Sequence, residues 1–227
     1  MERGRPVKWR RQFSSATGRA SPSVELQRPW QSAEYLSLDF EATGLDLRND
    51  DVVSFGAVPI RDGRIVVGEF AYSLVRPTKP VPPESSKFHV IRNQDLADAP
   101  TGAEAAAVLM NALQGRVLLA HAAWVESAFL RRLFKLQGVS FVSPVIDTAA
   151  LARALGLRPR IDTHEPHLET LANELGVPVH DPHHALGDAF TTAQVFLVLG
   201  HRLERQHGPL EVADLVNFTR EYALLRP

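Results

Sequence analysis

The sequence contains no cysteine among its 227 residues. This absence excludes a disulfide framework, a zinc site built on thiolates and any reaction with a cysteine nucleophile. It fits a reducing compartment, and we expect a cytoplasmic protein. Long apolar runs are missing too. No segment approaches the roughly 18 apolar residues that a membrane-spanning helix needs, and no signal-peptide core follows the basic start, so we expect no membrane partner.

An excess of charge is also absent overall, because the net charge is −1. A balance near zero gives no support for broad electrostatic binding of nucleic acid. The charge is unevenly distributed, however. Residues 1–30 hold seven Lys or Arg and two Glu, a net charge of +5, and the rest of the chain carries −6. We expect residues 1–30 to form a flexible basic arm, either a plain tail, a targeting segment or an arm that binds nucleic acid or a partner.

The remaining composition is that of an ordinary globular protein, with 44% hydrophobic and 22% charged residues. The length suits one large domain with appendages. We expect a folded domain over residues 31–200 and a C-terminal helical extension over residues 201–227. The sequence has no internal repeat.

Apolar periodicity predicts strands first and helices later along the chain. Strands are expected over residues 35–41, 52–60, 64–75 and 117–121, with Asp62-Gly63 as a hairpin turn between the second and the third. A Pro-rich passage follows residue 75. Helices are expected over residues 102–113, 124–137 and 168–175, from residue 184 or 185 onward, and near residues 210–222. This order predicts an α/β fold in which a mixed five-stranded sheet is flanked by helices.

Two acidic residues occupy alternate positions of the first predicted strand. Asp39 and Glu41 project from the same face, whereas Phe40 points to the opposite one. Apolar neighbours indicate that this strand is central in the sheet. Two carboxylates on a buried strand repel each other unless a cation neutralises them. An Asp-x-Glu pattern is weak evidence alone, because an ordinary strand end can also carry it.

Two further carboxylates lie on apolar faces of predicted helices. Glu126 shares the stripe of Phe129 and Leu130, so it is either a helix terminus that stabilises the dipole or a group kept inside for function. Asp188 repeats the pattern on the last long helix, and His183 lies five residues before it. An imidazole next to a metal-binding carboxylate is suited to deprotonate water near neutral pH.

Residues 37–45, Ser-Leu-Asp-Phe-Glu-Ala-Thr-Gly-Leu, together with residues 51–58, resemble the first motif of the DEDDh 3′–5′ exonucleases. This family of the ribonuclease H-like superfamily is typified by the proofreading epsilon subunit of bacterial DNA polymerase III. Residues 183–189, His-His-Ala-Leu-Gly-Asp-Ala, resemble its third motif, with His183 at the position of the catalytic histidine. The resemblance extends over about residues 35–199.

The second motif departs from the family pattern. The family usually has His-Asn followed by an aromatic residue and Asp, whereas this chain has His121-Ala122 and later Val125-Glu126. A carboxylate one methylene longer therefore stands in the Asp position, and the Asn is missing. We expect these changes to affect the rate, the metal preference and the packing around the terminal nucleotide.

The resemblance implies a ribonuclease H-like exonuclease domain over residues 31–200 that releases nucleoside 5′-monophosphates from single-stranded or frayed 3′ ends, with DNA favoured. It implies two divalent cations, Mg²⁺ or Mn²⁺, held by Asp39, Glu41, Glu126 and Asp188. His183 would be the general base. Substrate-binding positions would be Thr43, Gly44, Leu45 and His89.

Two other functions stay open at this point. The protein could trim RNA 3′ ends, because nothing in the motifs selects the sugar. It could also be a non-catalytic scaffold that binds nucleic acid or a partner and whose second motif is degenerate. The long polymerase-binding tail of the epsilon type is not evident, so we favour a stand-alone nuclease for DNA repair or turnover, with polymerase association left open. The oligomeric state is not indicated.

Overall fold

The computed structural model describes residues 24–157 and 167–223. Most of the predicted basic arm, residues 1–23, and the last four residues of the predicted C-terminal extension lie outside these ranges. Among the helices of the described ranges, none is both long enough and apolar enough to cross a membrane.

The strands form one mixed sheet in the order β3-β2-β1-β5-β6, with β4 also paired to β2. They are β1 (Tyr35–Ala42), β2 (Val52–Arg61), β3 (Arg64–Ile65), β4 (Ala71–Leu74), β5 (Val117–Ala120) and β6 (Val145–Asp147). Strand β1 is central, antiparallel to β2 and parallel to β5, so the predicted mixed sheet is confirmed. The sheet has six strands where five were expected. The strand expected over residues 64–75 is interrupted by a 3-10 turn, η3 (Val67–Glu69), and so contributes both β3 and β4, and β6 lies outside the four strand ranges that were predicted.

The hairpin between β2 and β3 is confirmed at the expected residues. Asp62 and Gly63 have φ angles of 51° and 66°. Positive φ at both central residues is what a type I′ turn requires, and this turn matches the right-handed twist of the two strands.

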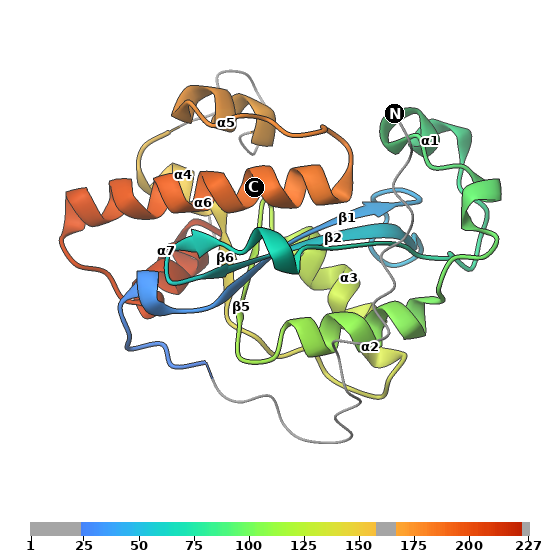
Figure 1. The fold of residues 1–227 in the computed structure, drawn as a ribbon, viewed down its shortest axis with the longest axis horizontal. Helices are drawn as coiled ribbons and strands as arrows, with labels where there is room; N and C mark the ends of the chain where they lie inside the picture. Colours follow the sequence, from blue (N-terminus) through green and yellow to red (C-terminus); the bar gives the residue numbers. More distant parts are fainter. Residues whose placement is uncertain (1–23, 158–166, 224–227) are drawn as a thin grey trace.

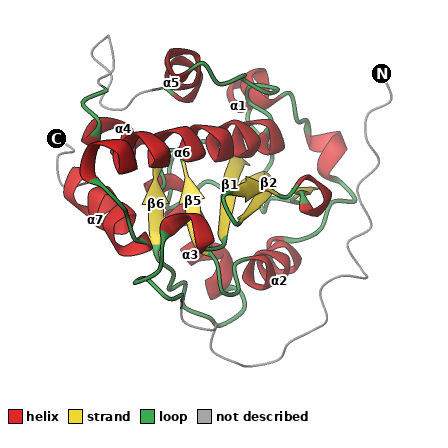
Figure 2. Ribbon diagram, turned by 60° about the vertical axis from the view of Figure 1, so that its left-hand side comes forward, coloured by secondary structure: helices red, strands yellow, loops and turns green. Residues whose placement is uncertain are grey.

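Helices cover both faces of the sheet (Figures 1 and 2). They are α1 (Pro83–His89), α2 (Gly102–Ala112), α3 (Trp124–Lys135), α4 (Thr148–Ala154), α5 (Leu168–Leu175), α6 (Ala185–His207) and α7 (Val212–Ala223), with 3-10 turns η2 (Trp30–Ser32) and η4 (Asn93–Leu96). The helices predicted from the periodicity all occur, whereas α1 and α4 were not predicted. Helix α1 begins inside the Pro-rich passage, with Pro83 in the first turn, where a missing N–H costs nothing.

The alternation along β1 divides the core into two layers. Tyr35 packs with Phe196 of α6, and the Ser37 hydroxyl donates to the carbonyl of Ala189 in the same helix at 2.8 Å. Leu38 and its alternate neighbours instead join the apolar cluster formed with α2 and α3, which includes Phe129. Because Asp39 and Glu41 continue the odd-numbered series, they lie on the face that α6 covers.

Segments near both ends of the described chain pack onto this body. The N–H of Trp30 donates to the carbonyl of Leu210 at 3.1 Å, and the N–H of Val212 donates to the carbonyl of Arg28 at 3.1 Å. Helix α6 continues through residue 200 to His207, and α7 packs against β6 and α4. Residues 24–30 and 201–223 therefore pack onto the described part of residues 31–200.

Trp30 is fully buried, and its ring meets α6 where that helix carries Gly200. A Cβ at this position would lie 2.7 Å from the indole, which is closer than real contacts allow. We expect Gly200→Ala to lower the free energy of unfolding by about 1–3 kcal/mol, because the rigid ring must shift. Urea denaturation measures this change. Gly68→Ala is the matched control, since a Cβ there meets nothing within 4 Å. Equal losses in both variants would contradict the close packing.

Candidate active site

Three carboxylates converge at the end of β1. Asp39 and Glu41 come from the strand and Asp188 comes from the first turn of α6. One oxygen from each of them lies within 4.8 Å of the others. The structure thus brings together three of the four acids that the sequence singled out. A register shift of β1 against β2 occurs between Glu41 and Ala42, and such bulges re-aim side chains next to functional sites.

The position of Asp188 depends on a close approach between α6 and the sheet. Gly56 of β2 is the direct partner of Asp39 in the strand register. A Cβ on Gly56 would lie 2.3 Å from the backbone of Ala185 and Leu186, so the first turn of α6 rests on the strand itself. Only glycine permits this contact, and it puts Asp188 beside the acids of β1.

The loop before α6 holds His183 next to Asp188. The N–H of His183 donates to the Asp188 carboxylate at 2.9 Å, and the φ angle of His183 is 60°. Gly187 lets the loop lie against the helix, because a Cβ there would meet the carbonyl oxygen of His180 at 2.3 Å. The imidazole is 55% exposed, with Phe88 at a ring-centroid distance of 6.0 Å and its Nε2 3.9 Å from Glu169. A solvent-accessible imidazole therefore stands at the border of the acid cluster.

Burial keeps these carboxyl groups from ionising readily, and neighbouring charges add to the effect at Asp39 and Glu41. Burial raises the pKa of Asp39 well above its ordinary value, and the charges of Glu126, Asp188 and Glu41 raise it further. Burial, followed by the charge of Asp188, raises the pKa of Glu41 to about 8. Burial also raises the pKa of Asp188 to about 6, against the lowering effect of the His183 N–H. A bound cation would relieve this repulsion, and an all-oxygen donor set suits Mg²⁺ or Mn²⁺.

Glu126 is buried at 4% exposure in the first turn of α3, a helix whose apolar residues pack on the sheet face opposite α6. It is not part of the group of three, but its charge is the largest electrostatic contribution to the raised pKa of Asp39. The preceding turn contains Ala122, whose φ of 55° is unusual for alanine. Asn and Gly tolerate this conformation better, which gives a physical reason for the Asn of the family motif.

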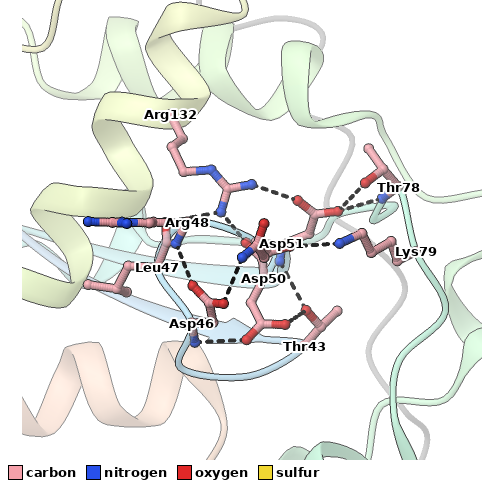
Figure 3. Close-up of polar contacts among 10 residues, drawn as sticks. Thr43, Asp46, Leu47, Arg48, Asp50, Asp51, Thr78, Lys79 and Arg132 are labelled. Carbon is pink, nitrogen blue, oxygen red and sulfur yellow. Dashed lines mark hydrogen bonds and ion pairs between the residues drawn. The ribbon is translucent and has the colours of Figure 1, made fainter.

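The predicted substrate-binding residues Thr43, Gly44 and Leu45 begin a loop that side chains fix from within (Figure 3). The Thr43 hydroxyl donates to Asp50 at 2.8 Å and accepts from the N–H of Asp51 at 3.0 Å. The Asp50 carboxylate lies so close to Gly44 that a Cβ would be 2.4 Å away. The Leu45 side chain, in contrast, is 78% exposed. The loop therefore presents an apolar side chain on a braced backbone.

His89, the fourth predicted substrate-binding residue, is buried in the structure. Its Nδ1 accepts a hydrogen bond from the N–H of Ile91 at 3.1 Å, and burial lowers its pKa while the nearby carbonyl of Ala42 opposes this. The imidazole supports the turn after α1, where Val90 has a left-handed φ of 60°. Contact of His89 with a substrate remains a prediction.

Two features of the site were not foreseen from the sequence. Phe88 of α1 is exposed beside the imidazole of His183. Arg132 of α3 donates to the carbonyls of Leu47 and Asp50 and pairs with Asp51 at 3.1 Å, so it braces the Thr43–Asp51 loop. These contacts join residues about 80 positions apart, and no local sequence pattern encodes them.

Comparison with known proteins agrees with this geometry. The RNase_T family model, described as "Exonuclease", matches residues 36–196. The DNA polymerase III subunit epsilon of Treponema pallidum is 30% identical over 177 residues, which are 77% of this chain and 80% of that protein. The chain belongs to this exonuclease family.

Other relatives are much longer proteins. An epsilon-like protein of Rhodobacter capsulatus is 36% identical over 80% of this chain, and a PolC-type DNA polymerase III of Thermotoga petrophila is 31% identical over 90%. The chain spans only 26% and 15% of their respective lengths.

Solved structures support the fold. Exonuclease X in complex with a 5′ overhanging duplex has a TM-score of 0.63 and 24% identity, and covers 82% of this exonuclease chain and 99% of its own. Exonuclease I of E. coli with a dT13 oligonucleotide has a TM-score of 0.67 and 17% identity, over 77% of this chain and 42% of its own. The expected ribonuclease H-like architecture is thereby confirmed.

The close contact between Gly56 and α6 predicts that a larger residue at this position disrupts the site. Gly56→Ala should displace the first turn of α6 and separate Asp188 from Asp39, because the added Cβ would overlap backbone atoms. We expect nuclease turnover to fall by at least about 100-fold, since small displacements in an active site are costly. Circular dichroism should still report a folded protein. A folded variant with normal turnover would contradict the dependence on this contact.

The raised pKa of Glu41 predicts how stability changes with pH in metal-free buffer. The folded-state pKa of about 8 lies above the ordinary value of 4.5, so the folded state binds the proton more tightly. Stability is lost as the pH rises between these values, and Glu41→Gln should remove this loss. The stabilisation by Glu41→Gln should grow from pH 4.5 to 8, and added Mg²⁺ should reduce it.

Thermal melting of both proteins across this pH range measures the effect. Glu174→Gln replaces an exposed carboxylate of α5 in the same way and serves as the control. A difference for Glu41→Gln that does not vary with pH would mean that Glu41 ionises normally in the folded state.

Proposed function

We propose that this protein is a metal-dependent 3′–5′ exonuclease that removes nucleoside 5′-monophosphates from unpaired 3′ ends, with DNA as the favoured substrate. The observation that carries the proposal is the convergence of Asp39, Glu41 and Asp188. The backbone N–H of His183 is hydrogen-bonded to the last of these carboxylates. Membership of the exonuclease family supports the same chemistry.

Asp39, Glu41 and Asp188, with Glu126 close to Asp39, would hold two divalent cations, Mg²⁺ or Mn²⁺. When bound, the cations supply charge that neutralises the scissile phosphate and make water a stronger acid. His183 takes the proton from the attacking water, whose oxygen forms a bond to phosphorus while the bond to the 3′ oxygen of the next nucleotide breaks. The backbone N–H of His183 donates a hydrogen bond to Asp188, and this bond fixes the position of His183.

The loop that begins at Thr43 would receive the 3′-terminal nucleotide. Its backbone is braced through Asp50, and the exposed Leu45 would separate the terminal base from the next one. Such a wedge favours an unpaired end, because no base pair has to be opened. The exonucleases of similar fold were solved with a 5′ overhanging duplex and with dT13, which supports DNA as the substrate class.

A role beside a DNA polymerase is the second candidate. It is favoured by the Treponema relative, a DNA polymerase III epsilon subunit of which the chain covers 80%. Repair or turnover by a stand-alone enzyme requires the same site. Copurification with a polymerase would distinguish these two roles.

The proposed activity is tested on a 5′-labelled single-stranded DNA of about 20 nucleotides with Mg²⁺. We expect shortening from the 3′ end by single nucleotides and release of 5′-monophosphates. RNA of the same sequence should be degraded more slowly. Faster degradation of RNA would favour the trimming function, and binding of either strand without hydrolysis would favour the scaffold.

His183→Ala should lower kcat by about 10²–10⁴-fold, which is the usual worth of a positioned general base. His184→Ala is the matched control. This neighbouring imidazole stacks on Tyr72 at a centroid distance of 4.5 Å, so its removal should change kcat by less than about 3-fold. Equal losses in both variants would show that the wrong histidine has been assigned.

Glu126 provides the sharpest test of the altered second motif. Glu126→Ala and Glu126→Gln should each lower turnover by at least about 100-fold, because both remove a charge that acts on Asp39. Glu126→Asp restores the usual family residue but shortens the reach by one methylene. We expect partial activity from it, with a changed ratio of Mg²⁺ to Mn²⁺ rates. Wild-type turnover in Glu126→Ala would remove Glu126 from the site.

A further inference from the structure

A groove of about 650 Å³ lies between the Thr43–Asp51 loop and the C-terminal half of α3. It is lined by Leu47, Arg48, Arg132, Lys135 and Leu136. Three of these five side chains are cations and none is an acid. The groove adjoins the loop that carries Leu45 but contains none of the three converging carboxylates.

The acids of the loop are engaged by nearby donors and do not line the groove (Figure 3). Asp46 accepts hydrogen bonds from Asn49 and from the N–H of Arg48, and Asp50 accepts from Thr43. Asp51 binds Thr78 on the far side of the loop. Donors within the loop thus hold Asp46 and Asp50, and donors outside it hold Asp51, whereas Leu47 and Arg48 extend toward α3.

The cations of the groove differ in their tasks. Arg132 is committed to two loop carbonyls and to Asp51, so it fixes one wall. Arg48 and Lys135 are exposed and form no salt bridge with another described residue, although the charge of Arg48 adds a minor part to the lowered pKa of Asp46. Two exposed cations thus remain available to an anionic ligand.

We propose that this groove binds the phosphodiester backbone of the substrate strand, on the nucleotides that follow the 3′-terminal one. This inference rests on the proposed function, which places the terminal nucleotide at Leu45. Arg48 lies three residues further, a span of at most about 11 Å. At about 3.4 Å per nucleotide of a strand in duplex DNA, this upper limit spans no more than roughly three phosphates, so the groove is within reach of the nucleotides next to the terminal one.

The lining also determines what kind of recognition the groove performs. It has no aromatic ring on which bases could stack and no amide side chain that could read a base edge. Cations that contact phosphates position a strand without reading its sequence. The groove therefore increases the affinity for strands of several nucleotides, irrespective of sequence.

A second cationic hollow supplies a matched control. It is lined by Leu155, Leu157, Arg202, Arg205 and Gln206 and has a volume of about 460 Å³. Arg202 follows Asp188 by 14 residues in the same helix, which puts it about 21 Å along the axis from the acid cluster. Replacing Arg202 and Arg205 removes two positive charges, as many as the loss of Arg48 and Lys135, from a place that the bound strand should not reach.

The test compares Arg48→Gln/Lys135→Gln with Arg202→Gln/Arg205→Gln in the full-length protein. The probe is a fluorescein-labelled single-stranded DNA of about 20 nucleotides, titrated in EDTA at several salt concentrations. The groove variant should bind about 10-fold more weakly at low salt. The slope of log K against log salt should become less steep by about 1.4, or 0.7 per lost phosphate contact on a single strand. The control variant should match the wild type. An unchanged slope in the groove variant, or an equal change in the control, would overturn the proposal.

Kinetics with Mg²⁺ separate this proposal from the proposed function. For the 20-nucleotide strand, the groove variant should raise KM about 10-fold with kcat within about 2-fold of the wild type. For a dinucleotide, which is too short to reach the groove, both constants should be unchanged. If the wild type hydrolyses neither substrate, the proposed function fails, but the binding comparison still decides about the groove. If hydrolysis is normal and KM for the long strand is unaffected, only the groove proposal fails.

Discussion

The contact between the first turn of α6 and Gly56 is the constraint on which the site depends. It lets a helix touch the backbone of a strand, directly beside the partner position of Asp39. The contact brings Asp188 to the acids of β1, and the Asp188 carboxylate then holds His183 by accepting a hydrogen bond from its backbone N–H. One missing Cβ therefore determines the geometry of both the carboxylate cluster and the imidazole next to it.

The cluster itself opposes folding as long as no cation is bound. Burial raises the pKa values of Asp39, Glu41 and Asp188, and the neighbouring carboxylates raise those of Asp39 and Glu41 further, so the ionised site is costly. The two apolar layers of the core, one under α6 and one under α2 and α3, offset this cost. Stability thus comes from packing, whereas the carboxylate cluster would be stabilised by a bound cation. At the Thr43–Asp51 loop, too, structural and functional side chains are separate. Hydrogen bonds hold the carboxylates of Asp46 and Asp50, whereas the cations Arg48 and Lys135 are exposed.

Much of the site follows from sequence periodicity. The strand period puts Asp39 and Glu41 on one face, and the helix period puts Asp188 on the inner face of α6. Other elements were beyond such reasoning. Prolines concealed α1, because the same residues that break helices also begin them. The brace formed by Arg132 joins residues far apart in sequence, and the burial of His89 depends on how the turn after α1 packs. The left-handed conformation of Ala122 likewise became evident only from the backbone.

The most direct test of the account is a calorimetric titration of the protein with Mn²⁺ at pH 7, in two buffers that differ in ionisation enthalpy. Because the pKa of Glu41 is raised to about 8, cation binding should release protons. The wild type is predicted to bind Mn²⁺ with proton release, and Asp39→Asn should lose both the binding and the release while it remains folded. Equal Mn²⁺ affinity in the two proteins, or binding without proton release, would contradict a cation site at these carboxylates.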